Sequence, residues 1–131
     1  MKVLLSIKPE YADKILDGKK HYEFRKALPK APDVTTVVIY ATMPVGKVVG
    51  EFEIDQFISK PPRELWSLTA EFSGITKRFF NEYFRGRDTA HAIKVRQPRR
   101  YAEPLELSEV VRGGVPPQSF CYLVWAPTDS A

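Results

Sequence analysis

The stretch that decides the fold is Gly18-Lys19-Lys20-His21-Tyr22-Glu23-Phe24-Arg25, where a short helix is expected to end and a strand to begin. Because strand side chains alternate between two faces, Tyr22 and Phe24 should point to one side. Glu23 and Arg25, together with His21, should point to the other side. The stretch therefore predicts an apolar face that packs on the core and a charged face that is available for binding.

The residues before this stretch predict a first strand and a short helix. Val3, Leu5 and Ile7 alternate with other residues, which is typical of a strand with one apolar face. A helix is expected from Pro9 to about residue 17, because proline suits the first helical turn and Gly18 suits a left-handed cap at its end.

The rest of the chain predicts short strands with helices between them. Gly50 is expected to form a bulge or a point of close backbone approach within one strand. We expect strands at 35–41, 48–58, 88–95 and 121–125, helices at 63–69 and about 76–84, a basic loop at 96–101 and a connector at 104–107. This order predicts an α+β fold, a small mixed or antiparallel β-barrel with short α-helices.

Length and composition favour one globular domain. The 131 residues are 44% hydrophobic and 27% charged, so the chain can bury a core without disulfides or metal ions. We expect a single domain over residues 1–126 and a frayed C-terminal tail over 127–131.

Several classes of function are disfavoured by residue usage. Cys121 is the only cysteine, so an intrachain disulfide and a cysteine-built zinc site are excluded, and its apolar surroundings favour a buried thiol. His21 and His91 do not form a metal-ligand pattern with acidic residues, so neither a metal nor a cofactor is expected. No signal peptide or membrane-spanning run is apparent, and we expect a cytoplasmic protein without a membrane partner.

Basic residues are concentrated in two segments. Residues 1–30 hold eight Lys and Arg against four acidic residues, and residues 76–112 hold nine against five, while the segment between them is net acidic. If the two segments converge, they would form a face that attracts nucleic acid or phosphate. The alternative is charge that serves only solubility.

The pattern Gly18-x-Lys20-x-x-Glu23-x-Arg25 after a short helix resembles the signature of the ASCH domain family, a branch of the PUA-like β-barrels. Four other regions are similar to the small standalone members of that family: Ser6-Ile7-Lys8-Pro9, Gly50-Glu51-Phe52, Tyr83-Phe84 and Pro117-Gln118-Ser119-Phe120. The resemblance implies a barrel with a cleft lined by the signature, which binds RNA or nucleotides in a regulator of transcription or translation.

Some members of that family are enzymes. The resemblance to a branch that hydrolyses N4-acetylcytidine places its catalytic lysine on Lys20, but its threonine nucleophile falls on Glu23. Ribonuclease activity is the other enzymatic reading. Because a carboxylate replaces the threonine, we interpret the site as more suited to holding a ligand than to cleaving one.

The candidate site residues follow from these arguments. Glu23 and Arg25 either form a salt bridge that closes the barrel end or hold a ligand together, with Arg25 donating to a phosphate or base edge. Lys20 is either a surface lysine or a phosphate contact and base. The predicted ligand-binding residues are Lys8, Lys20, Glu23, Arg25, Gln118 and Ser119, and the predicted phosphate-tracking residues are Lys19, Lys26, Arg96, Arg99 and Arg100.

Aromatic residues are expected mainly in the core. Tyr22 and Tyr40 share parity with apolar neighbours, and the helix at 76–84 carries two pairs of aromatic residues in which base stacking is the minority interpretation. Three functions stay open: RNA or nucleotide binding, with DNA as the alternative nucleic acid; an enzyme that uses Lys20 and Glu23 as an acid and base pair; and a protein-interaction barrel. The oligomeric state cannot be read from the sequence.

Overall fold

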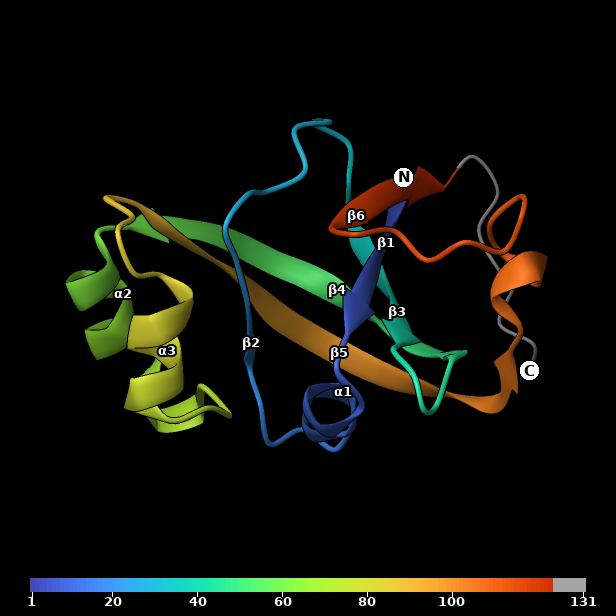
Figure 1. The fold of residues 1–131 in the computed structure, drawn as a ribbon, viewed down its shortest axis with the longest axis horizontal. Helices are drawn as coiled ribbons and strands as arrows, with labels where there is room; N and C mark the ends of the chain where they lie inside the picture. Colours follow the sequence, from blue (N-terminus) through green and yellow to red (C-terminus); the bar gives the residue numbers. More distant parts are fainter. Residues whose placement is uncertain (124–131) are drawn as a thin grey trace.

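The structure, a computed structural model, describes residues 1–123 and contains one mixed sheet with helices at its ends and on one face (Figure 1). The strand order is β2-β5-β4-β3-β1-β6. Among the strands of the described residues, only β1 and β3 pair in parallel; the other neighbours are antiparallel. The strands are β1 (Lys2–Ile7), β2 (Tyr22–Arg25), β3 (Thr36–Ala41), β4 (Lys47–Lys60), β5 (Ala90–Leu105) and β6 (Phe120–Leu123).

The expected barrel is not confirmed, because the hydrogen-bonded sheet stays open. It ends at β2 on one edge and at β6 on the other, and within residues 1–123 no ladder joins these two strands. The coarser expectation, a mixed sheet with short helices, is confirmed. The helices are α1 (Pro9–Leu16), α2 (Pro62–Thr69) and α3 (Lys77–Tyr83), and short 3-10 turns follow at Ala70–Phe72 and Leu107–Glu109.

The predicted end of the first helix is confirmed at Gly18. Gly18 has a φ of 79°, and its N–H donates to the carbonyl of Ile15. The N–H groups of Lys19 and Lys20 both donate to the carbonyl of Lys14, which satisfies a carbonyl left open at the helix end. This cap turns the chain from α1 toward β2.

The prediction of a basic loop at 96–101 is wrong, because these residues are part of β5. Glu53 of β4 lies opposite Arg96 and Glu51 lies opposite Arg99, so β5 carries one extra residue between these pairs. Gln97, with a φ of 48°, stands in this bulge. Pro98 is tolerated in the strand because it follows Gln97 at the bulge, where the ladder is interrupted. The connector expected at 104–107 likewise begins inside β5.

Gly50 is a point of close approach, as expected. A Cβ at this position would lie 2.5 Å from the carbonyl oxygen of Arg99 on β5, and the β4–β5 register shifts beside it. The predicted last strand begins at residue 120, and its residues 124–125 and the predicted tail at 127–131 lie outside the described residues.

Apolar side chains cover both faces of the sheet. Val3, Leu5 and Ile7 pack with Ile15 of α1 on one face, as the alternating pattern predicts. Leu4, Val38 and Tyr40 form a second core on the other face. Helices α2 and α3 lie together at one end of the long β4–β5 ribbon (Figure 1), where they bury a third core that includes Phe24.

Candidate nucleotide-binding site

A cavity of about 160 Å³ opens where the end of β1, helix α1, strand β2 and helix α3 meet. At about 30 Å³ for each water molecule, this volume would hold about five waters or one ring of a small ligand. The family signature supplies one wall, since Lys20, Glu23 and Arg25 all line the cavity. The remaining lining residues are Ser6, Ile7, Lys8, Tyr11, Phe24, Ile75, Phe79 and Tyr83.

Lys20 is buried, with 1% of its surface exposed, so the interpretation as a surface lysine is wrong. Its Nζ donates to the carbonyl of Ser73 at 2.6 Å and lies over the rings of Tyr11 and Phe24, 5.2 and 4.9 Å from their centroids. Burial lowers the pKa of Lys20 to about 8, while the nearby carboxylate of Glu23 acts in the opposite direction. Lys20 can therefore exchange a proton close to neutral pH.

The segment that holds Lys20 in place comes from far along the chain. Gly74 has a φ of 70°, and a Cβ there would lie 2.6 to 2.7 Å from three carbons of the Lys20 side chain. The backbone N–H of His21 donates to the carbonyl of Phe72, and the His21 ring stacks on the Phe72 ring. The sequence analysis missed this segment, although Gly74 shortly before a helix is a signal for an unusual backbone conformation.

Glu23 and Arg25 lie on one side of β2, as strand alternation predicts, and contact each other at 3.1 Å. Glu23 is buried rather than displayed on an open charged face, and burial raises the pKa of its carboxyl group against the opposing effects of Arg25 and Lys20. The two interpretations of this pair are compatible, because the salt bridge forms and both side chains also line the cavity.

Arg25 also connects the edge strand β2 to the opposite edge of the sheet, at the ends of β1 and β6. Its Nη2 donates to the carbonyl of Ser119 at 2.6 Å, and its Nη1 donates to the carbonyl of Ser6 at 3.4 Å. Ser119 does not line the cavity itself, but it accepts a hydrogen bond from Arg25, which does. Gln118 is exposed and is absent from the cavity lining.

The aromatic residues of α3 divide into two pairs. Phe80 and Phe84 are buried in the third core, as expected for all four. Phe79 and Tyr83 are half-buried and line the cavity. Tyr83 also packs against the third core, as expected, whereas Phe79 belongs to none of the three cores, so the core interpretation is wrong for Phe79 alone. The prediction for Tyr22 and Tyr40 is confirmed: Tyr40 is buried, and Tyr22 packs against the third core.

The predicted phosphate-tracking residues do not form one surface with the cavity. Lys26 is the nearest, with its Nζ 4.8 Å from the ring centroid of Tyr83, whereas Lys19 is exposed and does not line the cavity. The three arginines of β5 make ion pairs instead: Arg96 with Glu53, Arg99 with Glu51, and Arg100 with Asp13 and Asp17.

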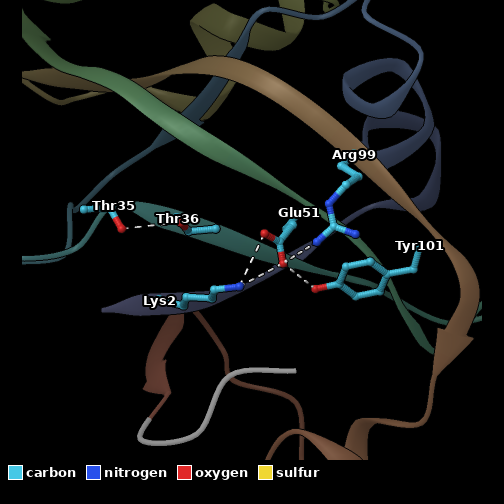
Figure 2. A network of polar contacts seen from close by, with 6 residues as sticks. All are labelled: Lys2, Thr35, Thr36, Glu51, Arg99 and Tyr101. Carbon is cyan, nitrogen blue, oxygen red and sulfur yellow. Dashed lines mark hydrogen bonds and ion pairs between the residues drawn. The ribbon is translucent and has the colours of Figure 1, made fainter. Parts of the chain in front are cut away.

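A second polar cluster surrounds Glu51 of β4. Figure 2 shows Lys2 of β1 and Arg99 and Tyr101 of β5 pointing toward this carboxylate. The Nζ of Lys2 lies 3.1 Å from Oε1, and the Tyr101 hydroxyl donates to the same oxygen at 2.8 Å. Because three donors share one carboxylate, we interpret this cluster as a brace between strands.

Two kinds of feature are absent from residues 1–123. No three His, Cys, Asp or Glu side chains in this range lie in an arrangement that could hold a metal ion. No helix within it is long and apolar enough to cross a membrane. Cys121 is half-buried, and burial raises the pKa of its thiol.

The sequence model of the ASCH domain family matches residues 5–99 of this chain, a range that includes the whole signature. The chain belongs to the ASCH domain family. An ASCH domain-containing ribonuclease of Zymomonas mobilis subsp. mobilis is 32% identical over 122 residues, which cover 92% of this chain and 82% of that protein. A crystal structure of an ASCH protein from Zymomonas mobilis has a TM-score of 0.85 at 30% identity, covering 93% of this chain and 87% of the other.

A further relative shows that the same domain occurs in a longer protein. The large ribosomal subunit protein uL22 of Ureaplasma parvum serovar 3 is 32% identical over 124 residues. These cover 92% of this chain but only 39% of that protein. The ASCH resemblance of the signature is thus confirmed by both sequence and structure.

Proposed function

We propose that this ASCH domain binds RNA in the cavity beside β2 and cleaves it as a ribonuclease. The observation that carries the proposal is that a buried lysine and a buried carboxylate, Lys20 and Glu23, line one cavity next to Arg25. Cations beside a proton-exchanging pair suit the chemistry of a phosphodiester. The similarity to the Zymomonas ribonuclease over most of both chains supports the same function.

In the proposed reaction, the carboxylate of Glu23 takes the proton of a ribose 2′-hydroxyl, and the 2′-oxygen attacks the adjacent phosphorus. The bond from phosphorus to the 5′-oxygen breaks, and the ammonium of Lys20 gives its proton to that oxygen. The products are a 2′,3′-cyclic phosphate and a free 5′-hydroxyl. Arg25 stabilises the negative charge on the phosphate oxygens during the attack.

The shifted pKa values of Lys20 and Glu23 support these roles. The raised pKa of Glu23 makes its carboxylate a stronger base, and the lowered pKa of Lys20 makes its ammonium a stronger acid. The reaction needs the 2′-hydroxyl, so DNA would be bound without being cleaved.

The second candidate is a module that binds RNA or nucleotides without cleaving them, as in a regulator of transcription or translation. Two contacts favour it: Lys20 already donates to Ser73, and Glu23 already pairs with Arg25. Hydrolysis of acetylated cytidine is less well supported, because Glu23 stands where that branch of the family has its threonine.

The test is incubation of the pure protein with 5′-labelled RNA and with DNA of the same sequence in EDTA, followed by mass analysis of the products. We expect cyclic phosphate ends from RNA alone. Lys20→Met and Glu23→Gln should each reduce cleavage at least 100-fold, in line with the usual contribution of an acid or base. Lys60→Met, at an exposed lysine that does not line the cavity, is the control.

Two outcomes would count against cleavage. If RNA stays intact at high protein concentration but binds with an affinity that Arg25→Ala weakens, the binding module is the function. If the two cavity variants cleave as well as the control, the cavity is not the catalytic site.

A further inference from the structure

We propose that Phe79 and Tyr83 of α3 form a stacking platform for an unpaired base, so that the ligand of the cavity is single-stranded RNA. This inference rests on the proposed function and adds a subsite to it. Both side chains line the cavity and are half-buried, while the neighbouring pair Phe80 and Phe84 supplies the core. Phe79 belongs to none of the three cores, and Tyr83 packs against the third core while it also lines the cavity.

The two rings form a continuous apolar wall. Their planes differ by 11° and their centroids lie 6.2 Å apart. Tyr11 of α1 contacts Phe79 in a T-shaped arrangement, with 5.7 Å between the ring centroids. Near-parallel rings offer a flat surface to the face of a base, and every base can use such a surface regardless of sequence.

Two exposed lysines lie over the platform. The Nζ of Lys8 is 5.4 Å from the ring centroid of Phe79, and the Nζ of Lys26 is 4.8 Å from that of Tyr83. An exposed lysine is held over a ring more weakly than a base stacks on it, so a base can displace either side chain. Each displaced ammonium would stay close enough to pair with a phosphate of the same strand.

The position of the platform determines the kind of nucleic acid that fits. The platform belongs to the same cavity as Lys20, Glu23 and Arg25, so a stacked base would hold the neighbouring phosphate group against these residues. In a duplex the bases are stacked on each other and cannot reach the rings. Single-stranded RNA should therefore bind, and duplex RNA of the same sequence should bind weakly.

The experiment uses a hexaribonucleotide that contains 2-aminopurine, whose fluorescence falls when it stacks on an aromatic ring. We expect the wild-type protein to quench the signal. Phe79→Leu and Tyr83→Leu should weaken affinity by about 5- to 150-fold each, the range for loss of one base stack, and should abolish the quenching. Tyr83→Phe keeps the ring and should behave as wild type.

The matched control is Phe57→Leu, which changes an exposed aromatic residue that does not line the cavity. Its affinity and quenching should equal those of the wild type. If the leucine variants of α3 also equal this control while the wild type binds and cleaves RNA, the platform is refuted and the proposed function stands. If the wild type neither binds nor cleaves RNA, both proposals are refuted.

Discussion

Replacing Gly74 by alanine should destabilise the fold through Lys20. Two costs apply. An alanine with a φ near 70° costs about 1 to 2 kcal/mol, and its Cβ would lie within 2.7 Å of three carbons of Lys20. Those carbons cannot move aside, because Lys20 is buried and its Nζ is held by the carbonyl of Ser73. Overpacking of this kind adds about 1 to 3 kcal/mol, so we expect a total of about 3 kcal/mol.

The control separates the two costs. Gly86 has a φ of 77°, but a Cβ there would meet nothing within 4 Å, so Gly86→Ala carries only the backbone cost of about 1.5 kcal/mol. Urea unfolding of both variants gives the difference. A double-mutant cycle with Lys20→Ala tests the contact, because this change removes two of the three carbons. In the Lys20→Ala background, Gly74→Ala should destabilise the fold by about 1 kcal/mol less than in the wild type, or by a still smaller amount. Equal destabilisation of the two glycine variants, or additivity in the cycle, would refute the contact.

Three further predictions concern proton exchange and the brace around Glu51. The kcat/KM for RNA should fall as pH rises through about 8, where Lys20 loses its proton, and this fall should be absent from the residual activity of Lys20→Met. Between about pH 8 and pH 10 an unfolded Lys20 keeps a proton that the folded state has lost, so the unfolding free energy of the wild type should rise with pH relative to Lys20→Met. A constant difference across that range would contradict the lowered pKa. Glu51→Ala should lower the free energy of unfolding by about 3 kcal/mol and Tyr101→Phe by about 1.5 kcal/mol, because the carboxylate serves three donors, of which the Tyr101 hydroxyl is one. Urea unfolding checks the order of these two values.

The sequence predicts those features that depend on local rules. The cap at Gly18, the proline at the start of α1 and the two-residue alternation of β2 each follow from the conformational preferences of single residues. These rules place Glu23 and Arg25 on one side of a strand, which the structure confirms.

Other features depend on contacts between distant segments and could not be read locally. Lys20 precedes β2, so the alternation of side chains along the strand does not fix where the Lys20 side chain points. Its burial is set by Ser73 and Gly74, which are more than fifty residues away in the sequence. The segment expected as a loop at 96–101 continues β5, because the bulge at Gln97 accommodates Pro98 within the ladder. The open edge between β2 and β6 is likewise a property of the complete sheet.

The division of α3 into two aromatic pairs also limits the length of the helix between them. Residues 79 and 83 lie one turn apart, as do residues 80 and 84, and one position turns an α-helix by about 100°. A single-residue insertion or deletion between residues 80 and 83 would therefore turn Tyr83 and Phe84 away from the faces that Phe79 and Phe80 occupy. Because one short helix serves both packing and the cavity, its length between these residues should be more tightly constrained than the identity of its exposed residues.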